Sequence, residues 1–298
     1  MSRGICHQTD ADLKRFFADR AERTLRYLDF ASTVNASAEG HHAQLATLGA
    51  DGAIVLPQFF DRATVLRIGG SVDDVIAEGR HLEPLKDRAR KVFGAASEGF
   101  ALRDRASSIG IEDPLVHLGG VTDLAFDARV LALASAYFTT VPMLSYAKVR
   151  KSFVNAIPPS PTQQFHVDIG TYSIFKVLVY LNDVESGGGP FGYVLGSHRR
   201  KFPDWDGKRY SAEEMAAHYG ADRVVRYHAR AGDAIIVESA GFHGGEKPIA
   251  NDRRILILNY TVHPEYGFEY PPVRMRRSEH AALSAYAQAV ADHVVLVD

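Results

Sequence analysis

The chain has 298 residues, of which 46% are hydrophobic and 23% charged, and a formal net charge of −2. This composition is typical of a folded globular protein, and the charge gives no reason to expect a nucleic acid or a membrane surface as a partner. The single cysteine, Cys6, excludes an internal disulfide and a cysteine metal cluster, which favours a reducing, cytoplasmic setting. Residues 1–14 lack the apolar core of a signal peptide, and no run approaches the length of a membrane span.

The part of the chain before residue 143 predicts mostly helices. Apolar residues near helical spacing favour a helix that begins at Asp10 and runs to about residue 30, followed by a polar break at 35–40. A short strand is expected at 53–56, after the turn Asp51-Gly52. The other segments of this part are expected to be helices at 43–48, 63–77 and 126–137, with mixed helix and loop over 80–125.

From residue 143 the chain changes character. Segments rich in Val, Ile, Tyr and Phe alternate with clusters of Gly, Pro, Asn or Asp, which predicts many short strands. These segments are 145–155, 163–168, 172–182, 223–228, 234–238 and 254–263. Between them, residues 211–219 predict a helix with Ser211 and Glu214 as a capping box, and 278–293 predict a C-terminal helix.

Short strands separated by turn signals favour a sandwich or a barrel. We therefore expect a mainly β fold with flanking helices, in which a helical N-terminal half packs around a jelly roll. The whole chain would form a single domain. Its parts would be a helical extension at 1–44, a core at 45–265 and a helical tail at 266–298.

The most informative motif is His166-Val167-Asp168. Residues i and i+2 leave the same face of a strand, so this imidazole and this carboxylate can bind one metal ion, whereas on a helix they would point roughly 200° apart. A third ligand is available downstream in His243, which stands in the glycine-rich segment 241–245. Two histidines and one carboxylate form the facial triad used for non-haem Fe(II) and oxygen chemistry.

A histidine two residues before an acidic residue is a weak signal by itself. The chain has two more, His81-Leu82-Glu83 and His263-Pro264-Glu265. The first runs straight into Pro84, and the second contains a proline, which ends ladder pairing. For the pair at 166 and 168, a surface histidine beside a turn aspartate remains the alternative to a metal site.

An arginine begins the apolar strand predicted after His243. Arg254 follows this histidine by eleven residues, and a guanidinium that enters an apolar strand needs a carboxylate or phosphate partner. Its planar fork suits a bidentate carboxylate. Arg253 must point to the opposite face, and strand parity cannot say which of the two faces inward.

In this order along the chain, the motifs resemble a known family. The set consists of His166-Val167-Asp168, the loop 187–190 leading to Gly196-Ser197-His198, the isolated His243 and an arginine eleven residues later. It is similar to the phytanoyl-CoA dioxygenase (PhyH-like) group of Fe(II)/2-oxoglutarate oxygenases. The resemblance covers roughly residues 45–265, and the segment 52–60 matches the way such chains open their catalytic domain.

This resemblance implies a double-stranded β-helix with catalytic iron held by His166, Asp168 and His243. It also implies that Arg254 binds the distal carboxylate of 2-oxoglutarate, since the family offset, and not strand geometry, selects Arg254 over Arg253. The implied activity is that of a dioxygenase, an oxidoreductase that uses molecular oxygen to hydroxylate an unactivated C–H bond of a small molecule, with release of succinate and CO2. Desaturation, epimerisation and ring formation stay open. Asp168 argues against halogenation, because related halogenases lack this carboxylate.

Two other functions use the same ligands or the same fold. A cupin-type isomerase or hydrolase could use the same three ligands, but its reaction needs no anchor such as Arg254. A non-catalytic jelly-roll binding protein would be expected to have a damaged ligand set, and here all three ligands are present. The sequence fixes neither the substrate nor the oligomeric state.

Further residues are candidates for contact with the cosubstrate or with an anionic substrate. On two predicted strands they share a face in pairs, Lys148 with Arg150 and Lys176 with Tyr180. A charged outer face of the barrel is the alternative. The remaining candidates are a loop-fixing His198, the basic clusters 199–201 and Arg274, Arg276 and Arg277, and a substrate lid containing Trp205 and Tyr210.

Overall fold

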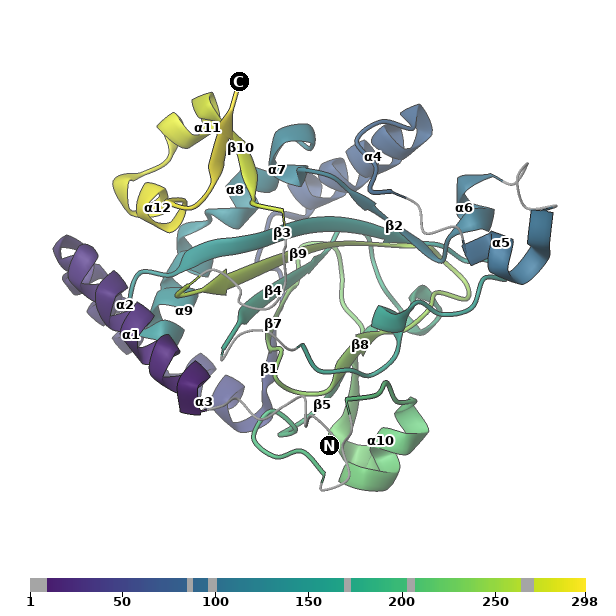
Figure 1. Ribbon diagram of the computed structural model, residues 1–298, viewed down its shortest axis with the longest axis horizontal. Coiled ribbons are helices and arrows are strands. Elements are labelled where there is room, and N and C mark those ends of the chain that lie inside the picture. Colours follow the sequence, from purple (N-terminus) through teal and green to yellow (C-terminus); the bar gives the residue numbers. More distant parts are fainter. Residues whose placement is uncertain (1–9, 85–87, 96–100, 169–172, 203–206, 264–270) are drawn as a thin grey trace.

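The computed structural model describes residues 10–84, 88–95, 101–168, 173–202, 207–263 and 271–298. Its centre is a large antiparallel sheet with the strand order β1-β7-β4-β9-β3-β2 (Figure 1). The strands of this sheet are β1 (Ala53–Leu56), β2 (Ser108–Ile111), β3 (Met143–Ser152), β4 (Phe175–Tyr180), β7 (Ala234–Glu238) and β9 (Arg253–Thr261).

A smaller antiparallel sheet faces the large one, with the order β6-β5-β8. Its strands are β5 (Phe191–Val194), β6 (Val224–Tyr227) and β8 (His243–Gly245). An isolated antiparallel bridge between His166 and His243 adds the segment around His166 to the free side of β8. The strand order of the smaller sheet is therefore His166 segment–β8–β5–β6, and this sheet faces strands β3, β9, β4 and β7 of the large one. Two facing sheets in this arrangement form a double-stranded β-helix. The predicted jelly roll is confirmed.

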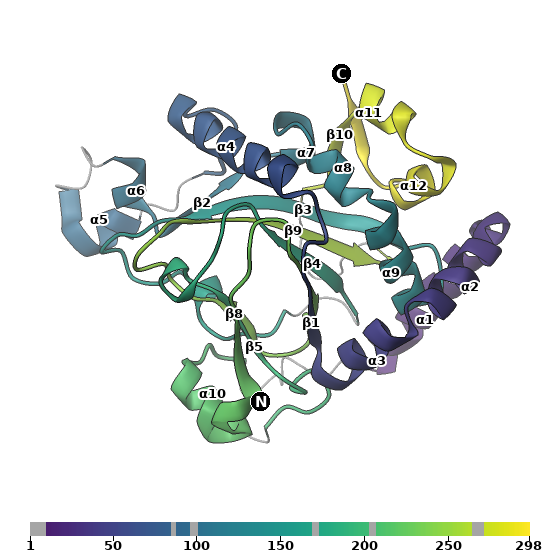
Figure 2. The ribbon, with the colours of Figure 1, turned by 180° about the vertical axis from the view of Figure 1, so that it is seen from behind.

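Helices cover the outer face of the large sheet. Figure 1 shows α4, α7, α8 and α9 on one side of this sheet and β5, β8 and α10 on the other, and Figure 2 shows α4 and α9 from behind. The helices are α1 (Asp10–Arg26), α2 (Ala31–Gly40), α3 (His42–Asp51), α4 (Arg62–Glu78), α5 (Arg88–Phe93), α6 (Leu102–Arg105), α7 (Pro114–His117), α8 (Val121–Ala125), α9 (Ala128–Phe138), α10 (Ala212–Tyr219), α11 (Arg277–Ala282) and α12 (Ala285–Val290). A two-stranded parallel pair, β10 (Arg274–Arg276) and β11 (Val295–Val297), lies beside α11.

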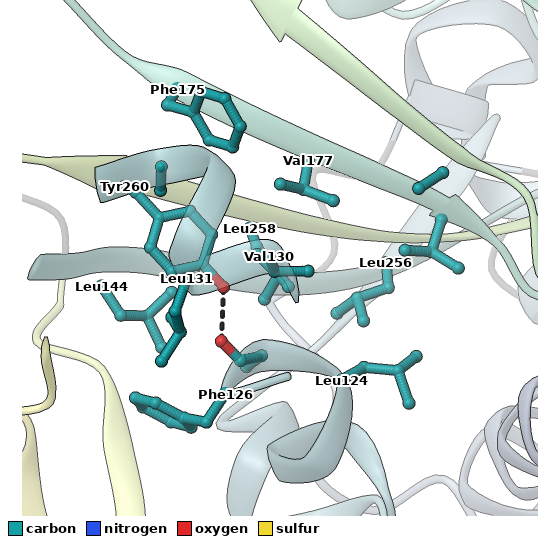
Figure 3. Packing of buried hydrophobic residues seen from close by; sticks show 14 of the residues in the cluster. Leu124, Phe126, Val130, Leu131, Leu144, Phe175, Val177, Leu256, Leu258 and Tyr260 are labelled. Atoms are coloured by element: carbon teal, nitrogen blue, oxygen red, sulfur yellow. Dashed lines mark hydrogen bonds between the residues drawn. The ribbon is translucent and has the colours of Figure 1, made fainter. Parts of the chain in front are cut away.

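The two faces of the large sheet belong to two different cores, because side chains alternate along each strand. Along β9, Leu256, Leu258 and Tyr260 pack with the helices (Figure 3), and the buried Tyr260 hydroxyl donates to the carbonyl of Ala125. Ile255 points the other way and packs with residues of β4, β5 and β7 between the two sheets. The sheet strands are thus buried on both sides.

Most predicted strands and helices are present, with shifts at their ends. Three expectations are wrong. Residues 163–168 do not form a regular strand, because the 3-10 helix η3 (Pro161–Gln163) overlaps their start and only isolated bridges at Phe165 and His166 follow. Helix α2 replaces the polar break expected at 35–40, and the single C-terminal helix is divided where Ser284 caps α12. Strand β2 was not expected, and the start of the strand predicted from residue 172 lies outside the described residues. Within the described ranges, no helix is both long enough and apolar enough to cross a membrane.

Candidate metal centre

His166, Asp168 and His243 come together at one edge of the smaller sheet. The backbones of His166 and His243 exchange two N–H···O hydrogen bonds of 2.9 Å, which places their rings side by side with centroids 4.5 Å apart. The Asp168 N–H donates to the carbonyl of Ser239 at 3.2 Å. Two segments about 75 residues apart in sequence therefore present three ligand groups to one point by ordinary strand pairing.

The two imidazoles offer the same nitrogen atom to this point. Nδ1 of His166 lies 2.8 Å from the carbonyl oxygen of Gln164, and Nδ1 of His243 lies 2.9 Å from that of Gly241. Each Nδ1 therefore carries the proton and donates, which leaves both Nε2 lone pairs for a metal. Nε2 of His166 lies 3.6 Å, and Nε2 of His243 3.5 Å, from a carboxylate oxygen of Asp168. The three residues can thus each offer one ligand atom within 4.8 Å of the other two.

The charges of the cluster suit a cation. Burial alone would raise the pKa of Asp168, but the ammonium of Lys176, which contacts this carboxylate, and the neighbouring histidines hold it well below its usual range. Burial lowers the pKa of His243 to about 4. An ionised carboxylate and a neutral imidazole are the forms that bind metal ions, so Asp168 and His243 are in their metal-binding protonation states near neutral pH.

Arg254 does not reach this site, which corrects the position expected from the sequence. Its side chain lies on the outer face of β9, where Nε donates to Asp73 of α4 at 2.8 Å and Nη2 contacts the second oxygen of the same carboxylate. Lys151 donates to Asp73 as well, at 2.9 Å. The reason is strand register, because Arg254 shares its face with Leu256 and Leu258, which pack against the helices.

Arg253 occupies the inner position instead. Its residue is only 4% exposed, and the guanidinium donates to the carbonyls of Gly189 and Glu246 and to Ser152 Oγ, with the last two contacts at 3.2 and 3.4 Å. Within the described residues its Nε has no partner and no carboxylate pairs with the group. Burial lowers the pKa of Arg253. A buried cation without a counter-charge is costly, so this position fits an anion.

Gly245, two residues after His243, leaves the space that Arg253 fills. A Cβ at Gly245 would lie 2.6 Å from Nη2 of Arg253. The guanidinium thus reaches the inner face of β8, the strand that carries His243. The signal for Arg253 was present in the sequence as the adjacent arginine, but the strand face could not be assigned without the register.

The other expected cofactor residues have separate positions. Lys176 lies at the metal cluster through its contact with Asp168. The Tyr180 hydroxyl is buried, donates to the carbonyl of Tyr227 at 3.1 Å and accepts from the Phe191 N–H at 2.6 Å. Lys148 faces the inside of the barrel next to Arg150 and forms an ion pair with Glu83. Of these residues, only Lys176 contacts a member of the triad in the described structure.

The weaker candidates are placed as follows. His198 lies 3.2 Å from the carbonyl of Gly49 and so links a loop to α3. Tyr210 bridges to Phe165, beside His166, and Trp205 lies outside the described residues. The three C-terminal arginines have their own contacts, Arg274 with Asp113, Arg276 with the carbonyl of Val116 and Arg277 with Asp298.

Fold and site together define a class, that of jelly-roll proteins with a two-histidine, one-carboxylate metal cluster. The family model for phytanoyl-CoA dioxygenase (PhyH) matches residues 49–255, so the chain belongs to this family. The predicted resemblance is thereby confirmed. No curated protein matches the chain in sequence.

Several solved structures are similar to the chain. The epimerase SnoN from nogalamycin biosynthesis, non-heme and alpha ketoglutarate dependent, has 16% sequence identity and a TM-score of 0.57, covering 78% of this chain and 88% of its own. HygX from Streptomyces hygroscopicus, solved with nickel and 2-oxoglutarate, has 19% identity and a TM-score of 0.50, covering 77% and 89%. EctD from S. alaskensis in its apoform has 19% identity and a TM-score of 0.50, covering 76% and 81%.

At these identities the likeness confirms the fold. Family membership and the His-Asp-His cluster together make the chain an enzyme of the iron- and 2-oxoglutarate-dependent type.

Proposed function

We propose that this protein is a 2-oxoglutarate-dependent dioxygenase that hydroxylates an unactivated C–H bond of a small molecule. His166, Asp168 and His243 hold Fe(II), and Arg253 binds the distal carboxylate of 2-oxoglutarate. The observation that carries the proposal is the buried guanidinium of Arg253, which has no carboxylate partner in the described residues and lies against Gly245, two residues beyond His243. An isomerase or hydrolase built on the same triad has no use for such a group.

The roles of the protein groups follow from their contacts. The Nδ1–H donors to Gln164 and Gly241 fix both imidazole rings with Nε2 toward the metal. Lys176 balances the charge of Asp168 and holds its carboxylate in place. When bound, iron and 2-oxoglutarate would supply the oxidising power with dioxygen. The cosubstrate would be converted to succinate and CO2, with one oxygen atom of O2 entering succinate and the other the C–H bond of the substrate. Apolar residues between the sheets, including Leu178, Phe191 and Ile255, keep this space poor in water.

The test is the visible charge-transfer band of an Fe(II)·2-oxoglutarate chelate in the absence of oxygen. We expect the parent protein to show the band and His243→Ala to lose it together with metal binding. Arg253→Met should still bind iron but weaken 2-oxoglutarate by about a hundredfold, on the order of a lost buried charge pair. Arg254→Met is the matched control, since its side chain lies on the outer face of β9.

Two results would contradict the proposal. A parent protein without the band is not an oxygenase of this type, and a loss of 2-oxoglutarate affinity in Arg254→Met with none in Arg253→Met would reverse the assignment of the two arginines. The reaction type is then read from the product mass. Hydroxylation adds one oxygen atom, desaturation or ring formation removes two hydrogens, and epimerisation leaves the mass unchanged.

A further inference from the structure

A cavity of about 400 Å3 lies between β2, β3 and the 3-10 helix η3 (Pro161–Gln163). Its wall includes Lys148 and Arg150 from β3, Ser108 from β2, Thr162 from η3, and Glu83 and Arg209. Helix η3 ends three residues before His166. The cavity therefore adjoins the segment that carries two of the three metal ligands.

Lys148 and Arg150 reach this cavity from the inner face of β3. Arg150 stands opposite Ile255 in the β3–β9 register, and opposite residues of an antiparallel pair share a face. Ile255 packs between the two sheets, whereas Val149 packs with the helices. The side chains of Lys148 and Arg150 therefore belong to the barrel interior, and the alternative of a charged outer face is wrong for this pair.

The cavity wall is positively charged. It has three cations, Lys148, Arg150 and Arg209, against the single carboxylate of Glu83, which is paired with Lys148. The pair is packed against Gly110, where a Cβ would lie 2.3 Å from the Glu83 carboxylate and 2.9 Å from Cε of Lys148. A glycine at this place leaves the ion pair room against the wall of the cavity.

Arg150 has no counter-charge in the described residues. Nη1 makes two hydrogen bonds at the distance limit, 3.5 Å to Ser108 Oγ and 3.5 Å to Thr162 Oγ1, and Nε is buried without a partner. A guanidinium normally forms short, paired bonds to a carboxylate or phosphate. With only two hydroxyl groups at 3.5 Å, most of the hydrogen-bonding capacity of the Arg150 guanidinium is unused.

Arg253 is a second buried cation on this inner face. It stands opposite Ser152, two residues along β3 from Arg150 on the same inner face, and the Arg150 charge adds to the effect of burial in lowering the pKa of Arg253. Two like charges that face the same space repel unless anions separate them. In the proposed function, Arg253 would bind the distal carboxylate of 2-oxoglutarate, and the metal ion would bind its other carboxylate. Arg150 is thus left for a second anionic molecule.

We propose that this cavity binds the primary substrate through an oxyanion, a carboxylate or a phosphoryl group, held by Arg150 and assisted by Arg209. The hydroxyl groups and the Glu83–Lys148 pair of the wall select a small hydrophilic molecule over one with a long acyl chain. This inference rests on the proposed function, because it assigns 2-oxoglutarate to Arg253. It names the substrate class of the same active site.

The first experiment needs no known substrate. The protein with Fe(II) and 2-oxoglutarate, kept free of oxygen, is titrated with inorganic phosphate and, separately, with acetate at constant ionic strength, while the visible band and the unfolding temperature are followed. We expect at least one of the two anions to bind the parent, and Arg150→Met to bind it about ten- to a hundredfold more weakly. The 2-oxoglutarate affinity of Arg150→Met should stay within about twofold of the parent.

Two further variants control for folding and for general charge. Arg150→Lys keeps the charge without the planar fork and should give intermediate binding. Arg223→Met removes an exposed arginine outside the cavity wall and should change nothing. Succinate release is then measured with carboxylated, phosphorylated and neutral polyhydroxy compounds, and we expect stimulation by one of the two anionic sets, which identifies the oxyanion.

Equal anion binding by the parent and Arg150→Met would overturn the inference, as would stimulation by the neutral set alone. A loss of 2-oxoglutarate affinity in Arg150→Met as large as in Arg253→Met would assign Arg150 to the cosubstrate instead. Failure of the proposed function has a different signature. In that case the parent shows no charge-transfer band, whereas anion binding to Arg150 is still measurable by the unfolding temperature.

Discussion

Glu238 is a carboxyl group at the end of β7 that the fold keeps from water. It is 9% exposed, and its two oxygens accept from Ser173 Oγ and the Ala240 N–H, both at 3.2 Å. Burial raises the pKa of Glu238 to about 8, against hydrogen bonds from backbone N–H groups that lower it. The next residue, Ser239, accepts the hydrogen bond from the Asp168 N–H. A neutral acid therefore supports the loop beside the metal cluster.

This raised pKa makes stability depend on pH. Between the ordinary value of 4.5 and about 8, the folded state keeps a proton that the unfolded state releases, so the free energy of unfolding falls as pH rises through this window. We expect Glu238→Gln to remove this dependence and to be more stable than the parent above the window by up to a few kcal/mol. Urea unfolding of both metal-free proteins across the window measures the difference, and parallel curves would contradict it.

At the scale of one element, β9 explains why the His-Asp-His cluster could be predicted from the sequence, whereas the faces of the two adjacent arginines could not. Both faces of β9 are buried, so Ile255 and Ile257 on one side and Leu256 and Leu258 on the other look alike in the sequence. No alternation of polar and apolar residues marks the inner face. The outer arginine is satisfied by Asp73, a residue 181 positions away. Such a partner cannot be inferred from local pattern.

The prediction for this element concerns the outer arginine. Arg254 links β9 to α4 through Asp73 and is 21% exposed at its side chain, against 40% for Asp73. We expect Arg254→Met to lower the free energy of unfolding by about 1 kcal/mol, because the pair is partly screened by water. Its Fe(II)·2-oxoglutarate band should be unchanged. A double-mutant cycle with Asp73→Asn measures the coupling, and a coupling of zero would show that the pair is not stabilising.

Other elements show which features can be predicted from local sequence signals alone. The capping box of Ser211 and Glu214 begins α10 as expected, with both hydrogen bonds present, because it depends on residues three apart. Strand β2 has only four residues, Ser108–Ile111, and pairs with β3. Its sequence, with Ser108 and Gly110 between the isoleucines, lacks the continuous apolar run that marked the equally short β1. The break before α12 arises because the side chain of Ser284 accepts from the Ala287 N–H, a cap within a segment of otherwise helical composition.

For the whole molecule, Arg23 joins the two ends of the described chain. This buried side chain of α1 donates to the carbonyls of Val141 and Pro142, which precede β3, and to that of Ala289 in α12. It also pairs with Asp292 at 3.0 Å, with exposed fractions of 5% and 8%. The N-terminal helix, the start of the jelly roll and the C-terminal helices are thus held by one guanidinium.

We expect Arg23→Met to lower the free energy of unfolding by about 3 kcal/mol, since it leaves buried carbonyl groups and Asp292 with fewer partners. Arg26→Met is the matched control. Arg26 also contacts Asp292, at 3.3 Å, but its side chain is 59% exposed, so the cost should be within about 0.5 kcal/mol. Chemical denaturation of both variants measures the contrast, and equal costs would show that burial of Arg23 is not decisive.

The two edge strands of the large sheet determine how far the chain can be truncated. One margin is β1, hydrogen-bonded to β7, and the other is β2, hydrogen-bonded to β3. Both strands precede β3, the first strand of the jelly roll. A fragment that starts at β3 would therefore expose the unpaired backbone edges of β7 and β3. Unpaired strand edges promote aggregation by pairing with other molecules. During translation β1 must likewise wait for β7, about 180 residues later. A transplantable module therefore has to include residues 53–111.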